Sequence, residues 1–394
     1  MAKFIFFSIP LRSHANPTFP IVRELVARGE EVIYYLTDTF KQEIEATGAT
    51  FRSYESQIEQ INKTAASSGK LVGLPMYMLD ESLFVLPQIL EDVRAERPDC
   101  IVYETMCLTG RLAAEILQVP AVNFRMIFAF PPQLVQIFRA NALHDPAGLA
   151  AFQASMEKAC ALYHIKPFAL ESIFTHEEAL NIVTIPRAFQ IDEASFGEHF
   201  CFVGSSIAPR KEQVEFPFEQ LEGQPVLYIS HGTVYNNRPD FFNLCFAAFA
   251  DTRWKVVMSI GQNVDREKLD TPPANFIVRG YVPQLEVLKY ADVCVTHGSM
   301  TTIIEAFSQR VPLVVVPQAT SDVKVNAMRV QQLGLGIMLD EKGLTAQILR
   351  DAVTRVSNDP AYYTRVLQMR EAIQRAGGYV RAADALQEFA RVHI

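Results

Sequence analysis

Short apolar runs alternate with helical segments in this chain. The alternating series runs through the first half and begins again in the second half. In the first half, the runs Phe4 to Ile9 and Val32 to Leu36 flank a helical pattern from Pro17 to Arg28 that ends at Gly29. A continuous apolar run of this length is typical of a strand buried on both faces of a parallel sheet. Repeated strand–helix–strand units therefore predict an α/β fold with helices on both faces of the sheet.

Further segments extend this pattern. The first half continues with strands at 101–103 and 121–124 around a helix at 110–117, and the second half begins after residue 220 with strands at 226–229, 255–260, 276–278, 293–296 and 313–316 and a helix at 240–250. The stretch 208–224 is charged, contains Pro209, Pro217 and Gly223, and has no periodicity. We therefore expect two doubly wound domains, residues 1–207 and 225–376, joined by a linker at 208–224, with the active site in the cleft between them.

Charge and composition exclude several classes of protein. With 36 basic and 44 acidic residues the formal charge is −8, whereas a nucleic-acid or membrane-surface binder needs a positive footprint. No apolar stretch reaches the roughly 18 residues that cross a bilayer. The six scattered cysteines indicate buried thiols in a reducing compartment. We therefore expect a cytoplasmic protein, a monomer or homodimer, that binds neither nucleic acid nor membrane.

The segment 295–305, VTHGSMTTIIE, concentrates polar chemistry at the end of a strand. A strand ends there in a turn of small residues, and a helix begins near Met300. The amides at such a helix N-terminus bind phosphate, and His297 and Thr302 add side-chain donors. Glu305 lies one turn further on, where a carboxylate can accept hydrogen bonds from both hydroxyls of a ribose. A capped helix with a polar surface turn is the alternative.

Two neighbouring loops lie at the same edge of the predicted sheet. The segment 279–284, RGYVPQ, offers Tyr281 as a flat face for a base and the backbone of Val282 for its edge. The segment 316–322, VPQATSD, follows the predicted strand at 313–316. Ligands of open α/β sheets bind at this carboxyl edge, so the three loops predict a nucleotide site.

These motifs resemble the donor-binding signature of the UDP-sugar glycosyltransferases with the GT-B fold, especially the bacterial macrolide-type branch. The resemblance runs through YVPQ at 281–284, THG at 296–298, EA at 305–306, VPLVVVPQ at 311–318 and LGLG at 333–336. YISHGT at 228–233 is similar to the first strand and loop of the donor domain. The likeness covers nearly the whole chain and implies two Rossmann-like domains facing across a cleft.

The resemblance also implies roles for single residues. Tyr281 would stack on uracil, Val282 would pair with it, Gln284 would lie near the nucleoside, and Glu305 would hold the ribose hydroxyls. The diphosphate would be contacted by Thr233, His297, Ser299, Met300, Thr301 and Thr302, and the sugar by Gln318 and Asp322. A carboxylate ready for a 2′,3′-diol favours UDP over a deoxythymidine donor.

The chain departs from the family pattern at several of these positions. Ser299 stands where the family usually has a second glycine, which tightens the approach of a phosphate. Thr301 and Thr302 replace an Asn-Ser pair and keep a hydroxyl. Val323 follows Asp322 where the family has Gln, so the choice of sugar stays open, with glucose as the default.

The general base is predicted in the N-terminal half. The loop SHANP at 13–17 follows the first strand, and it lacks the GxGxxG motif of NAD or FAD sites. A lone loop histidine is usually a surface or capping residue. In the family, however, the histidine of a similar GHxNP loop is the base, which implies this role for His14. The family pairs it with an Asp in PDxxxxD, and PDCIVYE at 98–104 places Glu104 there.

A mechanism follows from these roles. His14 would take the proton of an acceptor hydroxyl as its oxygen attacks the anomeric carbon opposite UDP, which inverts that centre. The helix terminus at Met300 and His297 would meet the charge of the leaving diphosphate. The sequence has no Asp-x-Asp motif, so we expect no metal and no other cofactor, with UDP-sugar as co-substrate.

The acceptor region and the last segment are less defined. The stretch 121–138 is rich in Phe and Met, and 71–90 is similar. In the family such segments line an apolar cavity for a macrolide, polyketide or flavonoid-like acceptor, while plain core is the alternative for each side chain. The candidate acceptor-binding residues are Phe124, Met126, Phe128 and Phe130. Residues 377–394 look like a helix that the family places against the N-terminal domain.

Two other functions stay open at this stage. One is a GT-B epimerase that acts on the sugar nucleotide itself. The other is a non-catalytic sugar-nucleotide binder or auxiliary subunit. The departures from the family pattern at Ser299 and Val323 keep this function open, whereas the pair of His14 and Glu104 argues against it.

Overall fold

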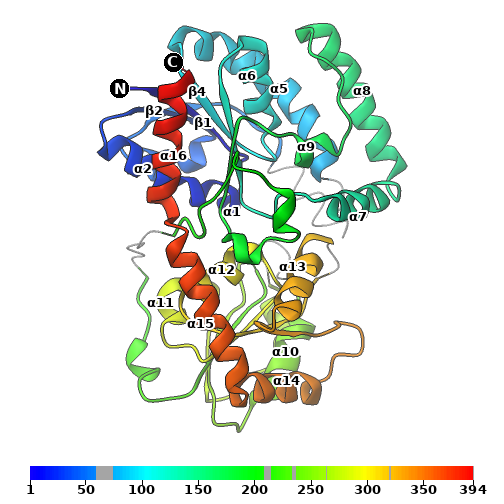
Figure 1. The fold of residues 1–394 in the computed structure, drawn as a ribbon. Coiled ribbons are helices and arrows are strands. Elements are labelled where there is room, and N and C mark those ends of the chain that lie inside the picture. Colours follow the sequence, from blue (N-terminus) through cyan, green and yellow to red (C-terminus); the bar gives the residue numbers. More distant parts are fainter. Residues whose placement is uncertain (59–73, 208–213, 233–236, 263, 319–320, 394) are drawn as a thin grey trace. The chain divides into compact units, whose positions relative to one another are not determined.

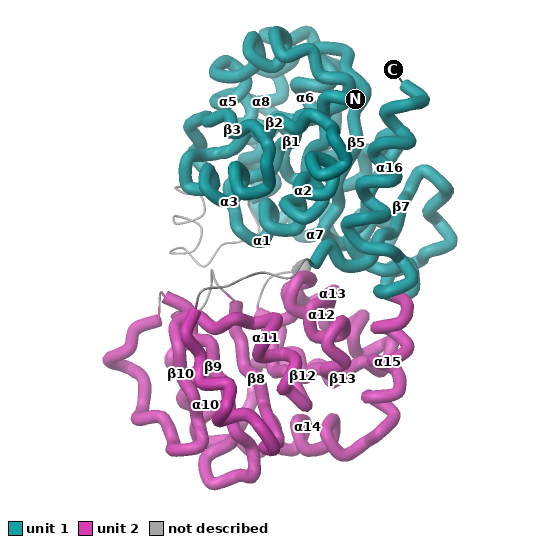
Figure 2. Tube along the Cα trace, turned by 90° about the vertical axis from the view of Figure 1, so that its left-hand side faces the viewer, with its two compact units in different colours: residues 1–208, 373–394 teal, residues 209–372 magenta. Residues whose placement is uncertain are grey.

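The chain folds into two compact units, which Figure 2 colours separately. The computed structural model describes residues 1–58, 74–207, 214–232, 237–262, 264–318 and 321–393, and of residues 321 and 322 only the backbone. Unit 1 comprises Met1–Ala208 and Ile373–Ile394, and unit 2 comprises Pro209–Ala372. The chain thus leaves unit 1 once and returns to it for its last segment.

Unit 1 is built on a parallel sheet of seven strands in the order β3-β2-β1-β4-β5-β6-β7. The strands are β1 (Lys3–Phe7), β2 (Glu31–Leu36), β3 (Thr50–Ser53), β4 (Cys100–Glu104), β5 (Ala121–Arg125), β6 (Leu180–Val183) and β7 (Phe200–Phe202). β1, β2, β4 and β5 are almost wholly buried, as expected of apolar runs covered by helices on both faces.

Helices cover this sheet on both faces (Figure 1). The helices of the first part of unit 1 are α1 (Arg12–Ala15), α2 (Phe19–Ala27), α3 (Lys41–Glu45), α5 (Leu74–Glu96), α6 (Leu108–Leu117), α7 (Pro132–Ala142), α8 (Pro146–Tyr163) and α9 (Ser172–Thr175). The predicted helix start at Pro17 is a 3₁₀ turn, Asn16–Thr18, and α2 itself begins at Phe19. The proline accounts for this start, because it lacks the N–H that a helix interior needs.

Unit 2 repeats the arrangement with six parallel strands in the order β10-β9-β8-β11-β12-β13. The strands are β8 (Val226–Ser230), β9 (Lys255–Ser259), β10 (Phe276–Arg279), β11 (Val293–Thr296), β12 (Leu313–Val315) and β13 (Gly336–Met338). The helices are α10 (Pro239–Phe249), α11 (Gln284–Leu288), α12 (Met300–Ser308), α13 (Ser321–Gln332) and α14 (Ala346–Asn358). The two parallel sheets with their helices confirm the predicted α/β fold of two Rossmann-like units.

The last two helices lead the chain back. α15 (Pro360–Arg375) is followed by α16 (Gly378–His393), which runs alongside α2 of unit 1 (Figure 1). Arg28, at the end of α2, donates hydrogen bonds to Asp384 at 2.7 Å and to Gln387 at 2.9 Å. Gln387 also donates to Glu30 at 2.5 Å. Apolar packing and these polar contacts attach residues 378–393 to unit 1.

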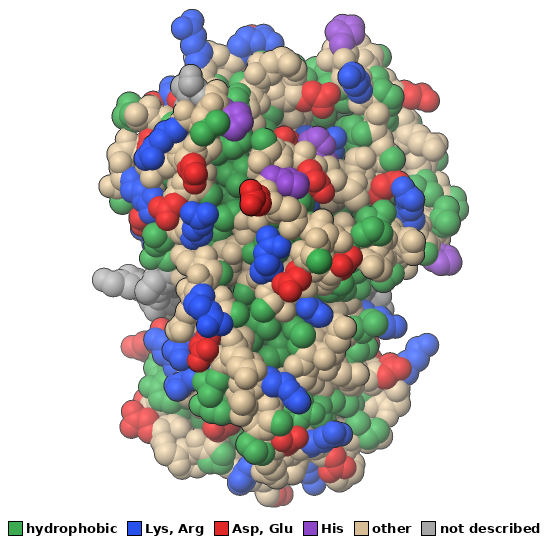
Figure 3. Space-filling view, viewed as in Figure 1, with side chains coloured by type: hydrophobic (Ala, Val, Ile, Leu, Met, Phe, Trp, Pro, Cys, Tyr) green, Lys and Arg blue, Asp and Glu red, His purple; other side chains and the backbone are tan. Residues whose placement is uncertain are grey.

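The surface carries both charges in mixture. On the face in Figure 3, Lys and Arg side chains alternate with Asp and Glu over both units. Among the described residues, no helix has the length and apolar character needed to cross a membrane.

Candidate active site

The loop after β1 and the end of β4 bring His14 next to Glu104. β1 and β4 are adjacent parallel strands, so their carboxyl ends lie at the same edge of the sheet. Glu104 is the last residue of β4 and is only 3% exposed, whereas the side chain of His14 in α1 is 23% exposed. His14 Nδ1 lies 3.2 Å from Glu104 Oε2. The structure thus brings together the two residues predicted as base and partner.

Glu104 is oriented by the backbone and lies at ion-pair distance from His14. Glu104 Oε1 accepts a hydrogen bond from the N–H of Met106 at 3.1 Å, which orients the carboxylate. Nδ1 and Oε2 are at ion-pair distance, but their angles are not those of a hydrogen bond. Catalytic hydrogen bonds often align only when substrate binds. A carboxylate at Nδ1 favours the tautomer protonated there, which leaves Nε2 to accept a proton.

Two hydroxyl groups donate to the backbone of the loop that contains His14. Thr18 donates to the carbonyl of Ala15 at 2.7 Å, and its Oγ1 lies 2.8 Å from the hydroxyl of Tyr34. Ser206 donates to the carbonyl of Pro17 at 2.6 Å. These contacts stabilise the short helical loop, so that His14 has a fixed position relative to β4.

In unit 2, the equivalent edge carries a helix N-terminus. β11 ends at Thr296, and α12 begins four residues later after a glycine with φ of +99°. A Cβ on Gly298 would lie 2.9 Å from Val315 Cγ1, so the close turn requires glycine. Ser299 is the N-cap, and its Oγ accepts from the N–H of Thr302 at 3.4 Å and lies 2.9 Å from Thr302 Oγ1.

This turn has the chemistry of an anion site. The first amides of a helix have no partner within the helix, and the helix dipole favours negative charge there. Thr301 and Ser299 are half-buried, and Met300 and Thr302 are buried. His297 precedes the turn and is half-buried. The predicted diphosphate contacts from β11 and α12 therefore lie together, although their role in binding stays a prediction.

Two partly buried hydrogen bonds connect three elements of unit 2. The hydroxyl of Tyr228, in the middle of β8, donates to Gln284 Oε1 at 2.9 Å. Gln284, the first residue of α11, donates from Nε2 to Glu305 Oε2 at 2.5 Å. Glu305 in α12 is 2% exposed and Tyr228 1%. The sequence predicted Gln284 and Glu305 separately; their direct contact and the part of Tyr228 were not predicted.

Tyr281 and Val282 follow β10 and have opposite environments. Tyr281 is 49% exposed, which leaves an aromatic face available to a base. Val282 is 2% exposed, so any pairing with a ligand falls to its backbone. Both environments suit the predicted nucleoside contacts, which stay a prediction.

A second histidine at this edge was missed. His231 directly follows β8, is 1% exposed, and stacks on Phe241 with ring centroids 4.3 Å apart. Among the described residues neither ring nitrogen has a hydrogen-bond partner. Burial, with the nearby His297 as a smaller cause, lowers the pKa of His231 to about 3. A histidine in a small-residue turn after a buried strand is the signal that singled out His297, and it is present here too.

Of the remaining predicted donor residues, Gln318 lies within the described part of the chain. Gln318 donates from Nε2 to the carbonyl of His231 at 3.2 Å, which joins the loops after β8 and β12. Gly232 has φ of +85°, and a Cβ there would lie 2.6 Å from the ring of His297. Thr233 and the side chain of Asp322 lie outside the described residues.

The predicted acceptor residues are mostly core. Phe124, Met126 and Phe128 are buried, and Phe128 stacks on Phe189 at 5.6 Å. Phe130 is half-buried and stacks on Phe174 with centroids 4.5 Å apart. Of the four, Phe130 therefore presents most surface, and acceptor contact by any of them stays a prediction.

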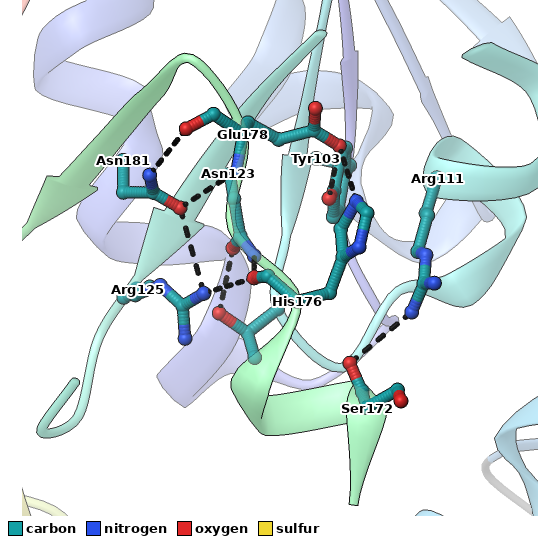
Figure 4. A network of polar contacts seen from close by, with 9 residues as sticks. Tyr103, Arg111, Asn123, Arg125, Ser172, His176, Glu178 and Asn181 are labelled. Atoms are coloured by element: carbon teal, nitrogen blue, oxygen red, sulfur yellow. Dashed lines mark hydrogen bonds and ion pairs between the residues drawn. The ribbon is translucent and has the colours of Figure 1, made fainter. Parts of the chain in front are cut away.

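A polar network fixes the segment that carries Phe174 (Figure 4). Arg125, at the end of β5, is 2% exposed and donates to the carbonyls of Phe174, at 2.7 Å, and of His176. Burial lowers the pKa of Arg125 to about 10. Tyr103 donates to Glu178 at 2.7 Å, and His176 lies 3.0 Å from the same oxygen. Although burial opposes it, these two contacts hold the pKa of Glu178 below its ordinary value.

Metal and disulfide chemistry have no site among the described residues. No group of three or more His, Cys, Asp or Glu side chains there could hold a metal ion. All six cysteines are free thiols, four of them buried.

Comparison with known proteins gives the same assignment along the whole chain. Residues 244–376 match the model of the EryCIII-like family, the C-terminal domain of erythromycin biosynthesis protein CIII-like proteins. The chain is 36% identical over 383 residues to NDP-glycosyltransferase YjiC of Bacillus subtilis, which covers 97% of this chain and 96% of the relative. It is 28% identical over 397 residues to oleandomycin glycosyltransferase of Streptomyces antibioticus, covering 98% and 90%.

A solved structure agrees with these relatives. The calicheamicin glycosyltransferase CalG4 superimposes with a TM-score of 0.82 at 31% identity, covering 100% of this chain and 99% of that one. Identity of this level over the full length, together with the two Rossmann-like units, shows that the chain belongs to the bacterial macrolide-type UDP-glycosyltransferases of the GT-B fold and is a glycosyltransferase with a nucleotide-sugar donor.

Proposed function

We propose that the protein is an inverting, metal-independent glycosyltransferase. It moves a sugar, by default glucose, from a UDP-sugar to a hydroxyl group of a small, largely apolar natural product. His14 is the general base and Glu104 its partner. The observation that carries this proposal is the contact of 3.2 Å between His14 Nδ1 and Glu104 Oε2 at the carboxyl edge of unit 1.

The reaction is a single displacement. Nε2 of His14 takes the proton of the acceptor hydroxyl while its oxygen forms the bond to the anomeric carbon. The bond from that carbon to the diphosphate breaks at the same time, and UDP leaves from the opposite face. Glu104 stabilises the imidazolium that forms. An α-linked donor therefore gives a β-glycoside.

Charge on the leaving diphosphate is met without a metal ion. The N-terminus of α12, with Ser299, Met300, Thr301 and Thr302, supplies amide and hydroxyl donors in a fixed arrangement. His297 precedes this turn. We expect undiminished turnover in EDTA, and strict dependence on added magnesium would contradict this part of the proposal.

The donor is assigned as UDP on the basis of Glu305. A carboxylate accepts hydrogen bonds from both hydroxyls of a ribose, but only from one of a 2′-deoxyribose. Tyr281 stacks on the uracil, Val282 pairs with its edge, and Gln318 and Asp322 face the sugar. A UDP-sugar is therefore preferred to its deoxythymidine analogue.

The acceptor class is supported by the relatives and by unit 1. One relative is named for oleandomycin and one solved neighbour for calicheamicin. Phe130 and Phe174 form an aromatic pair in the segment that follows β5. The half-buried ring of Phe130 would suit an apolar, hydroxylated acceptor such as a macrolide, polyketide or flavonoid-like compound.

Mass spectrometry of reactions tests the proposal directly. A panel of UDP- and dTDP-sugars is paired with macrolide and phenolic acceptors, and the product is examined by NMR for its anomeric configuration. A β-glycoside from an α-linked UDP-sugar is expected. A retained configuration would contradict the mechanism. An altered sugar nucleotide formed without acceptor would indicate an epimerase, and binding of UDP without any product would indicate an auxiliary subunit.

A further inference from the structure

Tyr228 is connected to the predicted ribose site although it lies in the core of the sheet. Its hydroxyl donates to Gln284 Oε1 at 2.9 Å, and Gln284 Nε2 donates to Glu305 Oε2 at 2.5 Å. The three residues come from three different elements, β8, α11 and α12. Both ends of this series are nearly inaccessible, with Tyr228 1% and Glu305 2% exposed.

The direction of each hydrogen bond is determined by chemistry. An ionised carboxylate only accepts, so the amide group of Gln284 must turn its NH₂ toward Glu305. Its carbonyl oxygen then faces Tyr228 and needs a donor. Burial raises the pKa of Tyr228, which keeps the phenol protonated at neutral pH and able to donate. The reverse amide orientation would place a carbonyl oxygen against the carboxylate.

We propose that Tyr228 is a positioning residue for the ribose of the nucleotide donor: through Gln284 it holds the Glu305 carboxylate in the orientation that accepts the ribose hydroxyls. This rests on the proposed function, in which Glu305 binds those hydroxyls. Tyr228 itself does not touch the nucleotide. Its effect on binding is transmitted by the amide of Gln284, whose orientation it selects.

A purely structural role for Tyr228 makes a different prediction. Tyr228→Phe removes one oxygen and keeps the ring that packs in the sheet. It leaves the half-buried Gln284 Oε1 without its donor, and an acceptor shielded from water that loses its donor is costly, so the amide reorients. If the hydroxyl serves only stability, every ligand is affected alike. If it positions Glu305, only ligands with ribose hydroxyls are affected.

Calorimetric titration with two probes separates these cases. The full-length protein is titrated with UDP and with 2′,3′-dideoxyuridine diphosphate, which lacks both hydroxyls. We expect Tyr228→Phe to weaken UDP binding about tenfold and to leave binding of the dideoxy compound within about twofold. Gln284→Met, which breaks the same series at its centre, is expected to show the same pattern and serves if Tyr228→Phe fails to fold.

A matched control comes from unit 1. Tyr103 is a strand tyrosine of equal burial whose hydroxyl donates to a side chain of unit 1, Glu178, at 2.7 Å. Tyr103→Phe should leave the affinity ratio of the two probes unchanged. If Tyr228→Phe has the same ratio of affinities for the two probes as wild type, the inference is overturned. This holds whether both affinities fall equally or neither changes.

The companion variant Glu305→Ala distinguishes this inference from the proposed function. If Glu305→Ala removes the preference for UDP and Tyr228→Phe does not, Glu305 binds the ribose and only the part of Tyr228 is wrong. If Glu305→Ala keeps the wild-type preference, the assignment of the ribose site fails, and the inference fails with it.

Discussion

The first strand of each unit ends in a loop that contains a histidine, and the two histidines differ in almost every physical respect. β1 and β8 hold equivalent places, each between the second and fourth strands of its sheet. His14, after β1, is 23% exposed and lies 3.2 Å from a carboxylate oxygen. His231, after β8, is 1% exposed, stacks on Phe241, and has a pKa lowered to about 3 by burial.

The fourth strands differ in the same way. β4 ends in Glu104, a buried carboxylate, whereas β11 leads into His297 and the N-terminus of α12. One edge therefore has a carboxylate beside a histidine, and the other has the amides of a helix N-terminus, which suit an anion. A doubly wound fold supplies the place for a ligand, while the side chains at the strand ends decide its chemistry.

The largest effect on turnover is expected from removing the side chain of His14. His14→Ala should lower kcat by about 10²–10⁴-fold, because the acceptor hydroxyl loses its base. Turnover is followed by mass spectrometry with a UDP-sugar and a phenolic acceptor. His199, a surface histidine paired with Glu177, provides the control, and His199→Ala should stay within about twofold of wild type. Wild-type turnover by His14→Ala would show that the base is elsewhere.

Neutralising the carboxylate beside His14 should have a smaller effect. Glu104→Gln keeps the shape of the side chain but removes the charge that stabilises the imidazolium. We expect kcat to fall about 10- to 100-fold while KM for the donor changes little. Equal losses in kcat and in donor affinity would indicate instead that Glu104 supports the fold of this loop.

His231 should make the stability of the protein depend on pH. Its folded-state pKa is about 3, below the ordinary value of 6.5. As pH falls below 6.5 the unfolded chain binds a proton that the folded chain does not, so stability decreases until about pH 3. At pH 5 this amounts to about 2 kcal/mol. Denaturant titration at pH 7.5 and pH 5 gives the free energy of unfolding that is lost between the two pH values. This loss should be smaller by about 2 kcal/mol in His231→Phe than in wild type. Equal losses in the two proteins would contradict the assignment.

The cap of α12 should give the smallest effect and separate stability from anion binding. Ser299→Ala removes the N-cap and should cost about 1 kcal/mol in the free energy of unfolding. Ser299→Asp restores a cap but places a negative charge beside the predicted diphosphate. We expect it to recover stability in denaturant titration and to bind UDP more weakly than Ser299→Ala. Equal UDP affinities of the two variants would exclude a diphosphate at this turn.

Most of the central strands could be predicted from the sequence to within a residue or two, but β6 was not predicted, because Asn181 interrupts its short apolar run. β11 has the bounds expected from its apolar run, and β8 extends the expected strand by one residue. The edge strands β3, β7 and β13 were not predicted, because each has only three or four residues, too few for a recognisable apolar run. α5 was predicted only as an apolar segment, since its buried positions are dispersed and Pro87 interrupts the pattern.

The site could be predicted as a set of residues but not as a set of contacts. The resemblance pointed to both His14 and Glu104, which are distant in the sequence and meet because β1 pairs with β4. The link from Tyr228 through Gln284 depends on the pairing of β8 with β11 and on side-chain direction, neither of which a motif records. His231 had the same turn context as His297, but only its burial shows that it differs.

The comparison of the two edges is tested most directly by the dissociation constant of UDP. Calorimetric titration of wild type, His14→Ala and Glu305→Ala locates the nucleotide on one unit. The account predicts that His14→Ala binds UDP as wild type does and that Glu305→Ala binds it at least about tenfold more weakly. The reverse, with UDP binding lost in His14→Ala and kept in Glu305→Ala, would place the nucleotide at the edge of unit 1 and contradict the account.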